Sequence, residues 1–235
     1  MVWDEFRALQ ENRDVAGLYE IWVYLETVRA VATSLGQRLE PDDNPDAVIR
    51  TLADGLHVNL AEGRKSEVSF VLPTGRVRVT YNQSYGRSAE DPRKTSAAAS
   101  YSLTLRPDVS VVLSRGTKRR RLLLDAKHRV DGSSKALQAD QDDEDDALEA
   151  TGQFKPADLH KMHTYRDAIG GAFAAVAVYP GSERRFYPSS RDEFVARGGV
   201  GAVPLQPREA YDHLSCAKQV GALMTAAWAS MEDRP

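Results

Sequence analysis

Two aspartates and one lysine stand beside the most apolar strand-like segments of the chain. Asp108 lies within LRPDVSVVL, Asp125 lies within LLLDAKHR, and Lys127 follows Asp125 by two residues. In an extended strand this spacing puts Asp125 and Lys127 on the same face. Ala126 then points to the other face, into the core, and its backbone carbonyl is available as a further metal ligand. Two acids and a lysine placed in this way favour metal-dependent hydrolysis of a phosphodiester.

That reaction needs an activated water and a way to spread the charge that builds up at phosphorus, and divalent metals supply both. Mg²⁺ prefers hard oxygen ligands, usually one or two carboxylates. The ammonium of Lys127 would orient or deprotonate the water, or hold a phosphate oxygen. The three residues therefore predict a Mg²⁺ site, with Mn²⁺ as a substitute. The alternative is that Asp108 and Asp125 only cap strand ends while Lys127 is a solvated edge residue.

The segments around these residues predict a β-sheet. From about residue 57 apolar and polar residues alternate, with Gly and Pro turns between the segments, which indicates an antiparallel meander. Two apolar strands follow over 102–114 and 119–130, joined by the short turn RGTK. They carry Asp108 and Asp125, so a hairpin between them would bring the two carboxylates together. We expect this hairpin to form the centre of the sheet.

Helices are predicted on both sides of this hairpin in the sequence. Residues 15–35 repeat apolar side chains every three or four positions, and Gly36 ends the helix. The predicted buried stripe of this helix is Leu18, Trp22, Leu25, Val28, Ala32 and Leu35. A second short helix is predicted over 46–56. A further helix over about 156–170, an apolar strand over 172–181 and a last helix over about 208–231 complete the chain.

The order of these elements predicts an α/β fold with a central mixed β-sheet flanked by helices. We divide it into an N-terminal helical layer, 1–56, and a core, 57–235, within one structural domain. The interval 131–155 is nearly free of apolar residues and predicts a flexible loop. It contains a run of seven acids, and setting these aside moves the net charge from −3 to +4. The remainder therefore permits binding to phosphates.

Composition excludes several other classes of protein. With 42% hydrophobic and 28% charged residues, the chain has the make-up of an ordinary globular domain, and no apolar run is long enough for a membrane span. The N-terminus has no apolar segment typical of a secretory signal, so we expect a cytoplasmic protein without a membrane role. Cys216 is the single cysteine, which excludes an internal disulfide framework and a cysteine-rich zinc site.

Other polar residues have two interpretations each. Lys118, Arg119, Arg120 and Arg121 form a basic cluster at the hairpin turn, which would either grip phosphates or be a solvated turn. Asn82, between Tyr81 and Tyr85, would contact DNA from a strand end, or the segment is simply sheet structure with ordinary aromatics. His160 and His163 share a helix, but no third nitrogen or sulfur ligand is evident nearby, so surface residues are favoured over a metal site.

Several stretches, taken in order, resemble the nuclease domain of the McrC-like branch of the PD-(D/E)XK superfamily. These stretches are LYEIW, YNQSY, LRPDVSVVL, LLLDAKHR, DLHKMHTYRDA and VAVYPG, and they cover nearly the whole chain. The resemblance implies a restriction-endonuclease-like core, with Asp108 and Asp125 as metal ligands and Lys127 as the catalytic lysine. It also implies that Glu20 matches the acid that the first helix often contributes, as a further metal ligand. The alternative for Glu20 is a charged residue on the wet face of the helix.

The resemblance extends to residues that contact nucleic acid and to a biological setting. Lys161 and Tyr165 match the spacing of a Gln-X-X-X-Tyr motif on the helix after the core hairpin, with lysine in place of glutamine. The implied activity is cleavage of double-stranded DNA in a prokaryotic restriction or anti-phage defence system. Relatives work with an AAA+ or other NTPase motor; this chain has no Walker motif, so we expect the motor on another chain or in a missing segment. The alternative function is a non-catalytic nuclease-fold subunit that binds nucleic acid or recruits the motor.

Overall fold

A seven-stranded mixed β-sheet forms the centre of the molecule. The computed structural model describes residues 15–37, 49–51, 58–60, 62–92, 97–128, 156–181, 184–188, 198–207 and 213–231. The strand order is β3-β4-β5-β6-β7-β9-β8. The strands are β3 (Val68–Leu72), β4 (Gly75–Tyr81), β5 (Val109–Arg115), β6 (Lys118–Ala126), β7 (Ala172–Tyr179), β8 (Arg185–Pro188) and β9 (Gly199–Pro204). The predicted α/β fold is confirmed.

The sheet has an antiparallel half and a parallel half that meet at β6. Strands β3, β4, β5 and β6 are antiparallel neighbours, as the predicted meander and hairpin require. Strand β7 lies parallel to β6 on its other side, and β9 lies parallel to β7. Helix α6 (Pro156–Ala168) lies between β6 and β7 in the sequence and so belongs to the crossover between these parallel strands. The strand carrying Asp125 therefore lies at the junction of the two halves.

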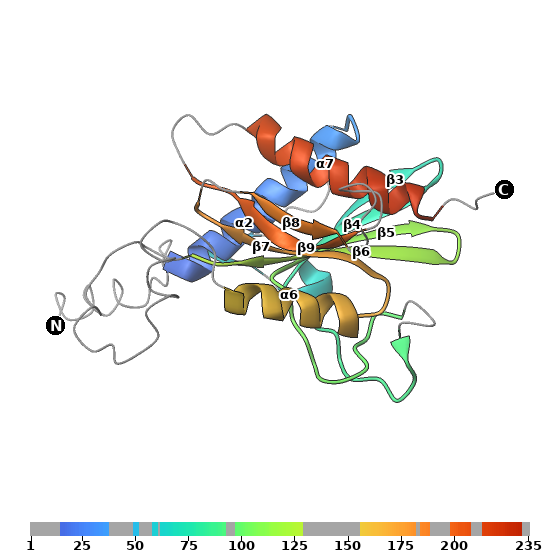
Figure 1. Cartoon of the computed structure of the whole chain (residues 1–235). Coiled ribbons are helices and arrows are strands. Elements are labelled where there is room, and N and C mark those ends of the chain that lie inside the picture. The colour runs from blue at the N-terminus through green and yellow to red at the C-terminus, as the bar shows by residue number, and fades with distance from the viewer. Residues whose placement is uncertain are drawn as a thin grey trace, which may run out of the picture.

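Helices cover both faces of the sheet (Figure 1). Helices α2 (Val15–Ser34) and α7 (His213–Ala229) pack together on one face, and α6 lies on the other. Alternating residues of each strand serve the two faces: Leu122, Leu124 and Ala126 join the core under α2 and α7, whereas Leu123 joins the core under α6. Residues of β6 with odd numbers, Asp125 included, consequently face α6.

Helix α2 is confirmed, and Val28 and Ala32 of the predicted stripe are buried, but the first turns of the helix bury other residues than predicted. Leu18 and Leu25 are 50% and 36% exposed, while Tyr19, Val23 and Tyr24 are buried. The two tyrosines bury their rings because each hydroxyl group reaches a backbone carbonyl, Leu205 for Tyr19 and Ser66 for Tyr24. The three- and four-residue spacing of apolar side chains predicted that Leu18 and Leu25 are buried. It does not show that a tyrosine can bury its ring when its hydroxyl group has a hydrogen-bond partner. The helix ends at Gly36, with φ 64°, as predicted.

The short helix predicted over 46–56 is wrong where the structure describes it. Ile49–Thr51 forms strand β1, which pairs antiparallel with β2 (Val58–Leu60) in a separate two-stranded sheet. The β-branched side chains of Ile49 and Thr51 favour an extended backbone, and pairing with Val58–Leu60 satisfies its hydrogen bonds. A 3₁₀ helix, η1 (Gly63–Ser66), then leads into β3. The proposed division of the chain after residue 56 stays a prediction.

Strands β8 and β9 were not predicted. Strand β9 has the sequence GVGAVP, in which glycines interrupt the apolar pattern, and β8 ends in proline. The glycines permit close packing of the two strands, because a Cβ atom at Gly199 would lie 2.1 Å from the carbonyl oxygen of Tyr187. The predicted helix over 156–170 and the predicted strand over 172–181 correspond to α6 and β7 and are confirmed.

Two predictions remain, on the loop with the acid run and on membrane spans, and the described residues limit what can be said of each. The loop predicted over 131–155, with its acid run, lies wholly outside them. No helix within the described ranges is both long enough and apolar enough to span a bilayer.

Candidate active site

Asp108 and Asp125 lie opposite each other at the end of the β5–β6 ladder. Val109 pairs with Leu124, so extending the antiparallel register by one residue places Asp108 opposite Asp125. Opposite residues on antiparallel strands share a face, with Cβ atoms about 4.5–5.5 Å apart. The Ala126 amide donates a hydrogen bond of 2.6 Å to Oδ2 of Asp108, which ties this carboxylate to the strand of Asp125. The hairpin therefore brings the two predicted acids together.

Asp125 is fully buried, and two lysines and a tyrosine surround its carboxylate. Nζ of Lys127 lies 2.5 Å from Oδ2, and Nζ of Lys161 lies 2.8 Å from Oδ1. The hydroxyl group of Tyr165 lies 3.2 Å from Oδ1. Burial of an isolated carboxylate is costly, and the two ammonium groups offset that cost. Lys127 lies on the predicted side of β6, and α6 brings Lys161 and Tyr165 to the same point.

Tyr165 connects Asp125 with the segment that precedes Asp108. Its hydroxyl group lies 3.1 Å from the carbonyl oxygen of Arg106 and 3.2 Å from Asp125, and its one proton serves one of these acceptors at a time. Burial, followed by the negative charges of Asp125 and Asp108, raises the pKa of Tyr165. The phenol therefore stays protonated and acts as a hydrogen-bond donor that holds Asp125 in place.

The pKa values at the site reflect crowded carboxylates. Burial, followed by the charges of Asp125 and Glu20, raises the pKa of Asp108 to about 7, against the lowering effects of the Ala126 hydrogen bond and of Lys161. Burial lowers the pKa of Lys127, but the hydrogen bond and charge of Asp125 outweigh it, so the net pKa is raised. Lys127 is thus a cation at neutral pH, and Asp108 changes its charge near neutrality.

Glu20 approaches this group of charges from α2, on the other side of the sheet. The Tyr81 hydroxyl group donates a hydrogen bond of 3.3 Å to Oε2 of Glu20, and the charge of Glu20 raises the pKa of both Tyr81 and Asp108. Tyr81 lies with Val77 and Val79 on the α2 face of β4. The alternation along the strand predicts this shared face, but it does not predict the contact between Tyr81 and Glu20. The role of Glu20 as a metal ligand stays a prediction.

Most of the chain matches a known protein family. The model of the PD-(D/E)XK nuclease superfamily matches residues 17–184, which is more than half of the sequence. The chain belongs to the PD-(D/E)XK nuclease superfamily. Pro107-Asp108 and Asp125-Ala126-Lys127 spell the motif for which this superfamily is named, and both lie inside the matched region. Neither the curated proteins nor the solved structures yielded a match.

PD-(D/E)XK nucleases generally use divalent metals, and the donors at the end of the hairpin fit one. Asp108 and Asp125 offer carboxylate oxygens, and a cation would relieve both the burial and the charge of Asp125 that raise the pKa of Asp108. Ala126 packs into the α2 and α7 core, as predicted. Among the described residues, no group of three or more His, Cys, Asp or Glu side chains is placed to hold a metal. A pair of carboxylates is sufficient for Mg²⁺, which keeps several of its waters.

The predicted phosphate-binding residues of the hairpin turn lie far from this nuclease site. Arg119 precedes Asp125 by six residues on β6, a distance of about 20 Å along an extended strand. Nε of Arg120 donates a hydrogen bond of 2.9 Å to Ser230, and Nζ of Lys118 donates one of 3.2 Å to the carbonyl oxygen of Met231, both just after α7. DNA contacts by Arg119 and Arg120 stay predictions.

Arg121 does not belong to an exposed basic cluster, contrary to the sequence interpretation. Its side chain is 1% exposed, donates a hydrogen bond to the carbonyl oxygen of Gly170 and lies over the ring of Tyr85, 5.8 Å from its centroid. Strand alternation explains the burial, because Arg121 shares the α6 face with Leu123 and Asp125. Arg121 therefore ties β6 to the turn after α6.

A backbone hydrogen bond joins Asn82 to Asp108. Its amide donates a hydrogen bond of 2.7 Å to the carbonyl oxygen of Asp108, and its φ of 49° lies in the left-handed region, which asparagine tolerates better than most residues. The residue is 8% exposed. Asn82 thus fixes the chain next to Asp108, and its proposed contact with DNA is not tested by this arrangement.

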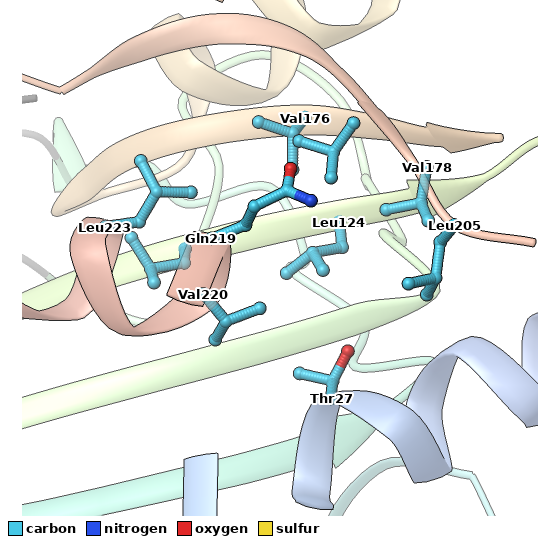
Figure 2. Close-up of a pocket in the computed structure, with 10 residues that line it drawn as sticks. Thr27, Leu124, Val176, Val178, Leu205, Gln219, Val220 and Leu223 are labelled. Atoms are coloured by element: carbon cyan, nitrogen blue, oxygen red, sulfur yellow. The ribbon is translucent and has the colours of Figure 1, made fainter. Parts of the chain in front are cut away.

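A cavity of about 20 Å³ lies on the opposite face of the sheet (Figure 2). Its lining is apolar apart from Thr27 and Gln219, and it lies among α2, α7 and strands β6, β7 and β9. The Thr27 hydroxyl group donates a hydrogen bond to the carbonyl oxygen of Val23. This cavity offers no acid, base or nucleophile, so the chemistry of the nuclease is assigned to the end of the hairpin.

Proposed function

We propose that the protein is a Mg²⁺-dependent endodeoxyribonuclease that hydrolyses phosphodiester bonds of double-stranded DNA. The observation that carries the proposal is the buried Asp125, with Lys127 2.5 Å away and Asp108 opposite in the hairpin register. Burial of Asp125 and its ammonium partners removes charges from water, and this cost in stability can exceed the attraction between them. Metal-dependent phosphate chemistry is a functional reason for keeping such a group of charges. A domain that only binds nucleic acid has no need of two acids close to the phosphates.

Each residue has a stated role in this proposal. Asp108, Asp125 and the Ala126 carbonyl would hold Mg²⁺, with Mn²⁺ as a substitute and Glu20 as a further ligand. The ion would supply positive charge for the developing negative charge and lower the pKa of a water. Lys127 stays protonated beside Asp125, so its ammonium would hold a phosphate oxygen and orient the attacking water. Tyr165 keeps the carboxylate of Asp125 in place.

The setting proposed for this activity is a prokaryotic restriction or anti-phage defence system in the cytoplasm. The support is the ordered resemblance to the McrC-like branch, whose members deliver cleavage for a partner that moves along DNA. The sequence contains no Walker motif, so the proposal places the NTPase motor on another chain or in a segment outside this sequence. Products with 3′-hydroxyl and 5′-phosphate ends are expected from the same resemblance.

A plasmid-nicking assay tests the proposal. Supercoiled DNA is incubated with the wild type, Asp125→Ala, Lys127→Ala and the exposed control Lys218→Ala on α7, with Mg²⁺, Mn²⁺ or EDTA. We expect metal-dependent nicking by the wild type and the control, and none by Asp125→Ala. DNA binding without metal-dependent cleavage by the wild type, even with a motor partner added, would instead favour a non-catalytic subunit that binds nucleic acid or recruits the motor.

A further inference from the structure

Both oxygens of Asp125 are in contact with an ammonium group. Lys127 lies at Oδ2 and Lys161 at Oδ1, at 2.5 and 2.8 Å. Oδ1 also lies within hydrogen-bond distance of the Tyr165 hydroxyl group. A divalent cation that binds one of these oxygens comes close to an ammonium group, and the two positive charges compete for the same carboxylate. The question is which lysine gives way.

The two lysines differ in how firmly they are held. The Lys127 side chain is 25% exposed and comes from the strand that carries Asp125, so its ammonium has little room to move away. The Lys161 side chain is 44% exposed and comes from α6, across the site from β6. Lys161 regains hydration when it moves outward, and a cation bound to Asp125 takes over the compensation of the buried carboxylate charge. Lys161 is therefore the group that can leave at low cost.

We propose that Lys161 neutralises Asp125 before a divalent cation binds and that the cation displaces it, which frees its ammonium to bind a DNA phosphate. This inference rests on the proposed function, and it gives Lys161 two successive partners. Its charge also lowers the pKa of Asp108, against the larger effects that raise it, so this ammonium acts on both acids. A divalent cation at the two acids replaces that effect.

The surroundings of Lys161 fit a phosphate partner. The ammonium already lies 5.4 Å from the ring centroid of Tyr165, and the hydroxyl group of that tyrosine borders the Arg106 backbone. The Arg106 side chain is 55% exposed and pairs at 3.2 Å with the equally exposed Glu62, so a second cation is present on the segment leading to Asp108 in an ion pair that solvent screens. Phosphates are bound by such lysine and arginine side chains at the surface. Metal binding would in this way raise the affinity of the site for DNA.

The first test measures metal affinity without DNA. Mn²⁺ is titrated into the wild type, Lys161→Gln, Lys161→Arg and the control Lys218→Gln, with binding followed by calorimetry or by the electron paramagnetic resonance of free Mn²⁺. Loss of the competing ammonium should tighten Mn²⁺ binding to Lys161→Gln by roughly tenfold, or about 1.4 kcal/mol. Lys161→Arg and Lys218→Gln should keep the wild-type affinity, because the first retains the charge and the second lies on the other face of the sheet.

The second test measures the coupling between metal and DNA. Affinity for a DNA duplex is determined with and without Ca²⁺, which serves as a divalent cation for binding measurements. In the wild type the metal should increase DNA affinity more than it does in Lys161→Gln, because only the wild type releases an ammonium group. Coupling between two ligands is reciprocal, so the duplex should increase the affinity for Ca²⁺ by the same factor.

A purely structural role for Lys161 predicts other results. In that case Lys161→Gln would lower the unfolding temperature and leave the Mn²⁺ affinity unchanged or weaker, which would overturn the inference. Absence of measurable Mn²⁺ binding in every variant would overturn it as well. The outcome is separate from the nicking assay: a nuclease whose Mn²⁺ affinity does not respond to Lys161→Gln refutes this inference alone, whereas tighter Mn²⁺ binding without cleavage refutes the proposed function alone.

Discussion

The two ends of the β5–β6 hairpin carry charged residues in opposite circumstances. At the open end, Asp125 is fully buried and held by two ammonium groups, and Asp108 lies opposite with a raised pKa. At the turn, Lys118 and Arg120 lie near the surface and bind the chain just after α7. Basic side chains at the end of a helix interact favourably with its dipole and its free carbonyl groups. The charges at the open end are buried at a cost in stability, whereas those at the turn bind the end of α7.

The difference follows from the direction of the parallel strands. Strands β6, β7 and β9 are parallel, so their carboxyl ends lie at one edge of the sheet, and Asp125 lies at that edge. In open α/β sheets ligand sites are found outside the carboxyl ends of the strands. The hairpin turn lies at the opposite edge. Topology thus separates the end suited to chemistry from the end suited to stability, and three predictions test that separation.

The largest effects are expected at the buried end. Asp125→Asn should abolish metal-dependent cleavage, since it removes a carboxylate charge from the metal site. Lys127→Met should lower the cleavage rate by about 10²- to 10⁴-fold, the range for loss of a positioned acid or base. Lys127→Met should keep its Mn²⁺ binding while Asp125→Asn loses it, because only Asp125 is a proposed ligand. Single-turnover rates and Mn²⁺ titrations provide the measurements, and wild-type cleavage by either variant would contradict the assignment.

The next effect concerns stability and pH. A carboxyl group whose folded-state pKa is raised to about 7 disfavours folding once it ionises, so its contribution to stability worsens as pH rises from about 4 to 7. Without metal, Asp108→Asn should therefore gain stability over the wild type at pH 8, by about 1–3 kcal/mol, and little at pH 4. Denaturant unfolding in EDTA at both pH values measures this. An equal change in stability at pH 4 and pH 8 would show that folding does not raise the pKa of Asp108.

The smallest effects are expected at the hairpin turn. Arg120→Ala should lower the free energy of unfolding by about 1 kcal/mol, through loss of the hydrogen bond to Ser230 after α7. Arg119→Ala should leave stability unchanged, because this exposed side chain is not used in fastening α7. If Arg119 also contacts a phosphate, Arg119→Ala should reduce the slope of the logarithm of DNA affinity against the logarithm of salt concentration by about one. A larger stability loss for Arg119→Ala than for Arg120→Ala would reverse the comparison.

Much of the site was predictable because strand alternation and hairpin pairing are strict. The Asp-X-Lys spacing places Lys127 beside Asp125, and the register brings Asp108 opposite. The spacing of Lys161 and Tyr165 predicted a shared helix face, and both reach Asp125. Sequence did not show that Lys161 pairs with the buried acid, because that contact depends on how α6 packs against β6.

The failures of prediction have physical causes of the same kind. Arg121 was placed in an exposed cluster, but alternation on β6 turns it toward the α6 core. Strand β9 was missed because its glycines, required for close packing against β8, weaken the apolar pattern. The helix predicted over 46–56 is a strand at Ile49–Thr51, because pairing with Val58–Leu60 outweighs a short apolar repeat. In each case a tertiary contact decides what a local pattern leaves open.

The most direct test of the central claim is the position of Mn²⁺ in crystals of the protein, located by anomalous scattering. The account predicts a peak between Asp108 and Asp125, with a carboxylate oxygen of each within about 2.0–2.4 Å of the ion, close to the Mg²⁺–oxygen distance. It also predicts that Lys161 has left Asp125. A metal bound elsewhere, or carboxylates more than about 8 Å apart, too far to share an ion, would contradict the claim.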